Sequence, residues 1–236
     1  MLYLIGAGIS GDLTLEGVEA LKKAEEIYIE VYTNPPLLEK MKEIEKTIGK
    51  EMKHIGRNDV ESSFLAERAQ EKTVALISGG DPLTATTHIV LIMDCKKKNI
   101  PVEIVHNSSI YTAAAGKSGL QIYRFGKTAS LVNPRPNYKP TSPIDIVKKN
   151  LDMDMHSLVL LDTEPEPMDA KTALDMLSGF GMAVVLSRLG ENDEKISYGA
   201  IDELKKKDLG KPPFSIIIPA KLHVIEEEYL EGLNHK

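Results

Sequence analysis

Short apolar runs alternate with longer amphipathic stretches along the first half of the chain. Runs such as Leu2 to Ile5 and Thr73 to Ile77 are typical of buried strands, whereas Leu37 to Ile48 carries apolar residues at helical spacing. We therefore predict strands at 2–5, 27–31, 52–55, 73–77 and 102–105, and helices at 14–24, 37–48, 60–70, 86–98 and 109–117. Asp59 is the expected N-cap of the third helix. This alternation requires a largely parallel sheet covered by helices.

The second half has more closely spaced strands. We predict them at 128–132, 158–161, 183–187, 195–198 and 215–218, with helices at 144–150 and 169–177. The polar turn between Ser187 and Ile196 is too short for a crossover helix, which predicts an antiparallel hairpin and a mixed sheet. We expect an α/β fold of two α/β domains, residues 1–120 with a mostly parallel sheet and residues 121–236 with a mixed sheet. The position of this boundary follows from the element count alone.

Composition narrows the classes of function. The chain has 236 residues, 42% of them apolar, which is enough for a large core. Its 29 basic and 35 acidic residues give a net charge of -6, so we expect no direct nucleic-acid binding. The apolar runs are far shorter than the roughly 20 residues that span a bilayer, and we expect no membrane segment or secretory signal. The single cysteine, Cys95, fits a cytoplasmic protein without internal disulfides. The six histidines lack close ligand spacing, so no metal is expected.

A glycine-rich segment, Gly6-Ala7-Gly8-Ile9-Ser10-Gly11, follows the first predicted strand. With Glu30 about 20 residues further on, it matches the dinucleotide-binding pattern, in which an acidic residue binds the ribose hydroxyls of a nicotinamide cofactor. However, Asp12 and Leu13 separate the last glycine from the predicted helix, so the glycines form a loop instead of leading directly into the helix. A tight turn without a ligand explains Gly11 equally well.

Two further motifs follow predicted strands. The segment 78–88, Ser-Gly-Gly-Asp-Pro-Leu-Thr-Ala-Thr-Thr-His, and the segment 106–110, His-Asn-Ser-Ser-Ile, both fall where open α/β sheets bind ligands. Gly79 and Gly80 would let a ligand approach the backbone, and Asp81 would accept a hydrogen bond from a hydroxyl or amine. Alternatively, Asp81 only caps a turn. Asp81 and His106 could assist removal of a proton, but the sequence assigns no catalytic residue.

Several segments together resemble one family. The segments 2–8, 80–88 and 106–110 resemble the diphthine synthases, a branch of the tetrapyrrole methylase superfamily. The segments Gly119 to Gly126, Leu160 to Asp162, Ser187 to Gly190 and Pro219 to His223 match the same family in order and spacing. The resemblance therefore covers nearly the whole chain.

The resemblance implies a tetrapyrrole-methylase-like fold and S-adenosylmethionine as methyl donor. It implies transfer of methyl groups to the amino group of the 3-amino-3-carboxypropyl-modified histidine of elongation factor 2, which gives diphthine in diphthamide biosynthesis. It also implies a homodimer, with the donor in the cleft between the two domains. Two alternatives stay open, a methyltransferase acting on a corrin-type small molecule and an NAD-dependent oxidoreductase. The donor-binding positions implied by matching motifs are Ile9, Asp81, Thr84, Ser109, Ile110, Leu161, Tyr198 and His223.

Overall fold

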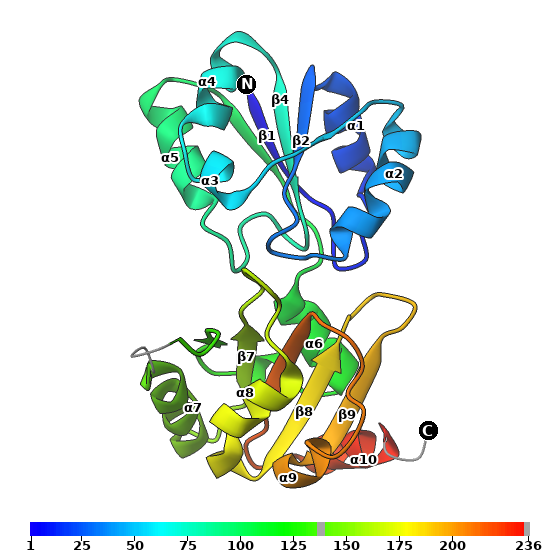
Figure 1. Cartoon of the computed structure of the whole chain (residues 1–236), viewed down its shortest axis with the longest axis vertical. Coiled ribbons are helices and arrows are strands. Elements are labelled where there is room, and N and C mark those ends of the chain that lie inside the picture. The colour runs from blue at the N-terminus through cyan, green and yellow to red at the C-terminus, as the bar shows by residue number, and fades with distance from the viewer. Residues whose placement is uncertain (136–139, 234–236) are drawn as a thin grey trace. The chain divides into compact units, whose positions relative to one another are not determined.

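The computed structural model describes residues 1–135 and 140–233 (Figure 1). The chain divides into two compact units, Met1–Ile110 and Tyr111–Lys236. The division therefore falls at the start of helix α6 (Ile110–Ser118), whereas the sequence placed it after this helix. Each unit is built around its own five-stranded sheet.

The sheet of the first unit is entirely parallel, whereas the sequence predicted a mostly parallel one. Its order is β3-β2-β4-β1-β5, so β4 is central, and β1 lies between β4 and the edge strand β5. Apolar side chains of β1 alternate between two cores, with Leu4 in one and Ile5 in the other. The sheet is therefore covered on both faces. Its strands are β1 (Leu2–Gly6), β2 (Glu26–Ile29), β3 (Lys53–His54), β4 (Val74–Ser78) and β5 (Val102–Val105).

Side-chain caps explain where some of the covering helices begin. The Thr14 hydroxyl accepts a hydrogen bond of 3.0 Å from the Gly17 N–H, which caps α1. The prediction of Asp59 as N-cap of a helix over 60–70 is wrong. Asp59 lies inside the separate short helix α3. Between α3 and α4, the Ser62 hydroxyl donates to the Asp59 carbonyl and accepts from the Phe64 N–H, so a side chain replaces the helical backbone hydrogen bonds at this break. The helices are α1 (Leu15–Lys23), α2 (Leu37–Ile48), α3 (Arg57–Val60), α4 (Phe64–Glu71) and α5 (Ile89–Lys97).

The second unit has the predicted mixed sheet, in the order β6-β7-β10-β8-β9. β6 pairs with β7 in parallel and the remaining pairs are antiparallel. The expected hairpin is confirmed, since β8 and β9 pair from Ser187 opposite Lys195 onward. Its strands are β6 (Ala129–Leu131), β7 (Ser157–Leu161), β8 (Met182–Ser187), β9 (Lys195–Ala200) and β10 (Phe214–Ile218).

Helices of the second unit pack against this sheet. One core joins Val159, Val185 and Ile216 of the strands to Val147 of α7 and Leu174 of α8. The sequence did not predict α9 or α10. The helices after α6 are α7 (Ser142–Asp152), α8 (Ala170–Met176), α9 (Ile201–Leu204) and α10 (Val224–Gly232), with short 3₁₀ turns η1 (Ile122–Arg124) and η2 (Ser178–Phe180).

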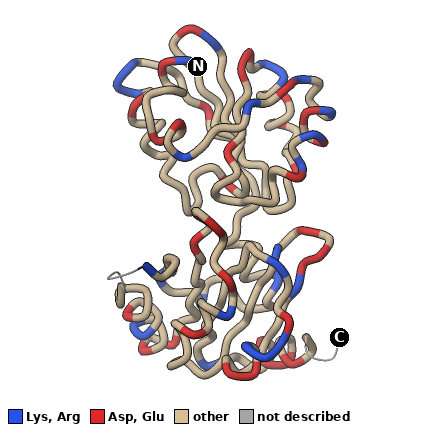
Figure 2. The backbone as a smooth tube through the Cα atoms, viewed as in Figure 1, with Lys and Arg blue, Asp and Glu red and all other residues tan. Residues whose placement is uncertain are grey.

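Charged residues of both signs are interspersed along the exposed segments of each unit (Figure 2). Within the described residues, every helix is too short or too polar to span a lipid bilayer.

Candidate functional site

The carboxyl ends of β1, β4 and β5 place three loops at one edge of the first sheet, because parallel strands end on the same side. The loop after β1 and the loop after β4 pair through Gly8 and Gly80. The Gly8 N–H donates to the Gly80 carbonyl over 3.0 Å, and the Gly80 N–H donates to the Gly8 carbonyl over 2.8 Å. Both glycines have positive φ, +64° and +71°, which other residues rarely adopt.

The glycines of these loops have different roles. A side chain at Gly6 would lie 2.5 Å from the Gly80 carbonyl oxygen, and one at Gly79 would overlap the side chain of Asn34. These two glycines are therefore required by packing within the protein. Gly80 differs from the other glycines of these loops because space is free beside its Cα. A Cβ atom placed there would lie 3.8 Å from the Ser108 carbonyl oxygen and 3.9 Å from Ser109 Cα, its nearest neighbours. The expectation that Gly79 would also leave space for a ligand is wrong, because Asn34 fills that space.

Asp81 is a buried carboxylate that joins the second and third loops. Its Oδ1 accepts hydrogen bonds from the Leu83 N–H over 3.0 Å and from the Thr84 hydroxyl over 3.2 Å. Its Oδ2 lies 2.7 Å from His106 Nδ1 and accepts from the Asn107 N–H over 3.3 Å. Burial alone would raise the pKa of Asp81, but the Leu83 N–H and His106 outweigh it and hold the pKa below its usual value. Asp81 is therefore ionised at neutral pH.

His106 is oriented by this carboxylate. Its side chain is 67% exposed, whereas that of Asp81 is 9% exposed. Because an ionised carboxylate can only accept a hydrogen bond, Nδ1 carries the proton. In the neutral ring, Nε2 is then an acceptor, and it has no hydrogen-bond partner among the described residues.

Asn107 joins the third loop to the first. Its Nδ2 donates to the carbonyls of Gly6 over 2.9 Å and Asp12 over 2.8 Å. The adjacent Ser108 hydroxyl accepts from the Ile9 N–H over 3.2 Å. Asn107 had no role of its own in the prediction from sequence, although its position two residues after the end of β5 already indicated that it lies at the sheet edge. The three loops therefore form one hydrogen-bonded set.

Glu30 does not have the role that a dinucleotide site would require. Its side chain is buried, and its carboxylate accepts from the N–H of Thr33 over 3.2 Å and from the Thr33 hydroxyl over 2.5 Å. Burial raises the pKa of Glu30 to about 7. Because the buried carboxylate is hydrogen-bonded to Thr33 of the same loop, it is not available to bind the hydroxyls of a ribose.

Five of the eight positions named from the sequence lie in these loops or directly after them. Asp81 and Thr84 are in contact, and the half-buried Ile9 contacts Ser108. Ser109 is buried directly before α6, and Ile110 is the first residue of that helix. The folded chain therefore brings Ile9, Asp81, Thr84, Ser109 and Ile110 to one edge of the first unit.

The other three positions lie in the second unit. Leu161 ends β7, and Tyr198 is in β9, with β10 and β8 between these strands. The pairing places Tyr198 in one row with Val184 and Ile217, on the face opposite to the core that contains Leu161. His223 is the N-cap of α10. Leu161 and Tyr198 therefore lie on opposite faces of the second sheet. Burial raises the pKa of Tyr198, and Glu227 and Glu231 of α10 lie close enough to raise this pKa further.

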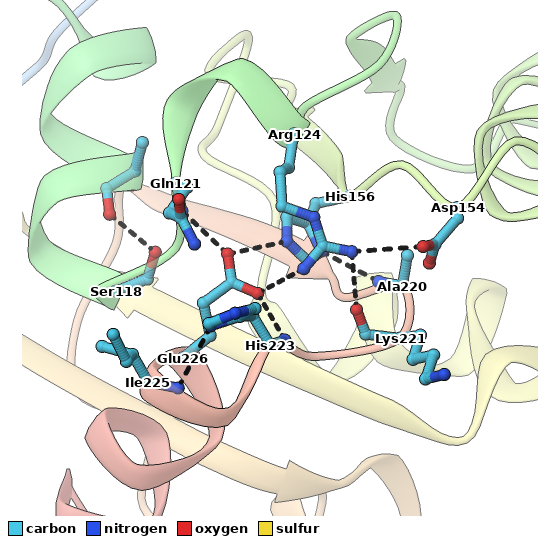
Figure 3. Close-up of polar contacts among 11 residues, drawn as sticks. Ser118, Gln121, Arg124, Asp154, His156, Ala220, Lys221, His223, Ile225 and Glu226 are labelled. Atoms are coloured by element: carbon cyan, nitrogen blue, oxygen red, sulfur yellow. Dashed lines mark hydrogen bonds and ion pairs between the residues drawn. The ribbon is translucent and has the colours of Figure 1, made fainter.

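His223 belongs to a segment that a buried carboxylate holds in place (Figure 3). Glu226 Oε2 contacts Arg124 Nη1 at 2.5 Å and accepts from the His223 N–H over 2.9 Å. Glu226 Oε1 accepts from the Gln121 N–H over 3.0 Å and lies 3.3 Å from His156 Nε2. Burial would raise the pKa of Glu226, but the His223 and Gln121 N–H groups and His156 outweigh it and lower it.

The surroundings fix the tautomer of His156. The Ala220 N–H donates to Nδ1 over 3.0 Å, so Nδ1 is unprotonated and Nε2–H points to Glu226 (Figure 3). Burial lowers the pKa of His156, which keeps the ring neutral. Arg124 also donates to the Lys221 carbonyl over 2.7 Å. The motifs at Gly119 to Gly126 and Pro219 to His223 thus meet in one polar cluster.

Comparison with known proteins supports one family. Residues 1–205 match the model of the Tetrapyrrole (Corrin/Porphyrin) Methylases. The chain is 39% identical over 254 residues to the diphthine synthase of Methanocaldococcus jannaschii, covering 99% of this chain and 98% of the relative. It is 37% identical over 248 residues to that of Methanothermobacter thermautotrophicus, covering 98% and 94%.

Solved structures agree with the sequence relatives. A crystal structure of diphthine synthase superposes with a TM-score of 0.90 at 35% identity, covering 98% of this chain and 95% of that one. A putative diphthine synthase from Entamoeba histolytica superposes with a TM-score of 0.89 at 34% identity, covering 99% and 98%. The similarity extends through both units.

Proposed function

This chain belongs to the tetrapyrrole methylase family and, within it, to the diphthine synthases, and from this premise we propose that it methylates the 3-amino-3-carboxypropyl-modified histidine of elongation factor 2. The reaction transfers methyl groups from S-adenosylmethionine to the amino group of that side chain, giving diphthine in diphthamide biosynthesis. The observation that carries the proposal is the match to curated diphthine synthases over 98% or more of the chain. The enzyme is an S-adenosylmethionine-dependent methyltransferase.

The residues at the edge of the first sheet suit this donor. S-adenosylmethionine carries a positive sulfur, polar amino-acid and ribose groups and an apolar adenine. The edge offers the ionised Asp81, the hydroxyl of Thr84, the half-buried Ile9 and an open backbone position at Gly80. We propose that Ile9, Asp81, Thr84, Ser109 and Ile110 bind the donor. Leu161, Tyr198 and His223 join this proposal on the family resemblance alone.

The chain can contribute to the reaction chiefly by orientation. When bound, S-adenosylmethionine supplies a methyl group activated by its positive sulfur. Loops joined by hydrogen bonds, such as Gly8 to Gly80 and Asp81 to Asn107, hold binding groups in fixed positions before substrates arrive. Such fixed orientation accounts for a large share of the rate enhancement in many bimolecular reactions.

The direct test uses purified protein, isotope-labelled S-adenosylmethionine and elongation factor 2 that carries the 3-amino-3-carboxypropyl histidine. Mass spectrometry of the modified peptide should detect labelled methyl groups on that side chain. The same factor with an unmodified histidine is the control and should gain none. Donor binding without any transfer to the modified factor would contradict the proposed substrate while leaving the methyltransferase family in place.

A second acceptor class is suggested by the description of the matching family, which names corrin and porphyrin methylases. A corrin-type precursor therefore belongs in the same assay as a competing acceptor. We expect transfer to the protein and none to the corrin, because the full-length relatives are diphthine synthases.

Partners follow from the proposed reaction. Because elongation factor 2 acts in translation, we propose that the enzyme works in the cytoplasm. We also propose a homodimer, since α5 exposes the large apolar side chains of Ile89, Val90 and Met93, and such patches often mark interfaces. Sedimentation equilibrium should give the mass of two chains, and the mass of one chain would contradict the dimer.

A further inference from the structure

We propose that His106 is the general base of the methyl transfer and that Asp81 is its positioning residue. The proposal rests on the proposed function, because it concerns the amine that this function makes the acceptor. It adds a catalytic residue where the family resemblance supplies only donor-binding positions. Its basis is the contact between Asp81 and His106 together with the exposure of the histidine.

The geometry presents one nitrogen of His106 to solvent in a defined protonation state. Asp81 accepts from Nδ1 over 2.7 Å, and three other hydrogen bonds, from Leu83, Thr84 and Asn107, fix the carboxylate itself. The ring therefore keeps its proton on Nδ1 and leaves the lone pair of Nε2 outward. A carboxylate that fixes the tautomer and orientation of a histidine is a recurrent arrangement for general bases.

His106 also lies among the residues proposed to bind the donor. It contacts Asp81 directly and precedes Ser109 on the same short segment after β5. A base at this position lies in the same hydrogen-bonded loops that are proposed to bind the donor. The acceptor amine must approach that set in order to receive a methyl group.

The chemistry requires a base because an alkylammonium remains largely protonated at neutral pH and has no free electron pair. The acceptor ammonium gives its proton to His106 Nε2, which makes the ring an imidazolium paired with Asp81. The freed nitrogen lone pair forms a bond to the methyl carbon while the carbon–sulfur bond breaks and its electron pair remains on sulfur. The imidazolium then releases its proton to water, which restores the base for the next transfer.

The first test needs no turnover. Protein labelled with ¹⁵N in its histidines is examined by NMR, and the His106 signal is assigned by its loss in His106→Gln. At a pH where the ring is neutral, we expect a proton on Nδ1 and an unprotonated Nε2. A proton on Nε2 instead would overturn the proposal, because that nitrogen could not accept another.

The second test follows the rate of the first methyl transfer against pH with donor and acceptor in excess of the enzyme. At pH 7, His106→Gln should be slower by about 10²- to 10⁴-fold, the usual contribution of a general base. The deficit should shrink towards pH 9 to 10, where the amine loses its proton unaided, as expected from alkylammonium pKa values of about 10. A structural role would instead give a loss that is equal at all pH values, and such a constant loss would overturn the proposal.

Chemical rescue provides a third readout, because His106 is exposed and a small base can replace it. Added imidazole should restore part of the rate of His106→Ala, and imidazoles with higher pKa should restore more. His54→Ala, which removes an exposed histidine on β3, is the matched control and should respond to none of them. Absence of transfer in the wild type would refute the proposed function. Normal transfer in both His106 variants would refute only the role of His106.

Discussion

Two histidine–carboxylate pairs, Asp81–His106 in the first unit and Glu226–His156 in the second, share the same chemistry in opposite surroundings. The His106 side chain is 67% exposed, whereas His156 and Glu226 are 0% and 1% exposed. Asp81 contacts Nδ1 and leaves Nε2 outward. In the second unit the Ala220 N–H occupies Nδ1 and Glu226 faces Nε2, so both nitrogens of His156 are engaged.

The difference indicates what each pair does. A ring with both nitrogens engaged cannot exchange protons without losing a hydrogen bond, so His156 serves to connect segments of the chain. A ring with one free nitrogen and a fixed tautomer can accept a proton from a substrate. A histidine beside a carboxylate therefore indicates catalysis only if the second ring nitrogen has no hydrogen-bond partner within the protein.

The largest effect is expected when the buried carboxylate loses its charge. Glu226→Gln leaves Arg124 with only the exposed Asp154, at 3.4 Å, as a counter-charge, and it removes an acceptor from the N–H groups of Gln121 or His223. Removing one partner of a buried ion pair typically costs about 3–5 kcal/mol of folding free energy. Urea unfolding followed by circular dichroism should show a loss in this range.

The matched control is Glu228→Gln, an exposed residue on the same helix. It should change the free energy of unfolding by less than about 0.5 kcal/mol. If Glu226→Gln were as stable as this control, the buried pair would not stabilise the second unit, and the contrast between the two pairs would fail.

A moderate effect should appear in the pH dependence of stability. Burial holds the folded pKa of His156 below the ordinary value of 6.5. The unfolded chain therefore binds a proton that the folded chain does not, so stability is complete above about pH 6.5 and falls as the pH drops below it. One such proton changes the free energy of unfolding by at most about 1.4 kcal/mol per pH unit.

The measurement compares urea midpoints from pH 7.5 down to 5 in the wild type and in His156→Gln, which cannot titrate. The variant should be less stable throughout, but its stability should fall less steeply with acid. The variant is needed because other groups titrate in the same pH range. The lowered pKa of His88 also makes stability fall with acid, whereas the raised pKa of Glu30 makes stability rise with acid. Equal slopes in both proteins would contradict a neutral, buried His156.

The site in the first unit could be anticipated largely from sequence because its parts have local signals. Glycines and polar residues directly follow strands, and parallel strands bring such ends to one edge. The contact between Asp81 and His106 follows from this rule once β4 and β5 are placed beside β1. The packing roles of Gly6 and Gly79 could not be anticipated, because they depend on the Gly80 carbonyl and on Asn34 of another loop.

The cluster in the second unit had no comparable local signal. Glu226 is 102 residues from Arg124 and 70 from His156, and no periodic pattern connects them. α10 was missed, although His223 and Glu226 form a capping box at its start. Such boxes usually begin with Ser or Thr, and a histidine in that position hides the pattern.

The smallest stability effect is expected at His106, where the chemical effect should be large. His106→Gln removes an exposed ring whose one described contact is with Asp81, and the backbone N–H groups of Leu83 and Asn107 still satisfy that carboxylate. Exposed substitutions of this kind change the free energy of unfolding by about 0.5 kcal/mol or less. Urea midpoints of His106→Gln and the wild type at pH 7.5 should therefore nearly coincide. A loss comparable to that of Glu226→Gln would mean that His106 stabilises the loops as His156 stabilises its own segment, and the two pairs would then have the same structural role.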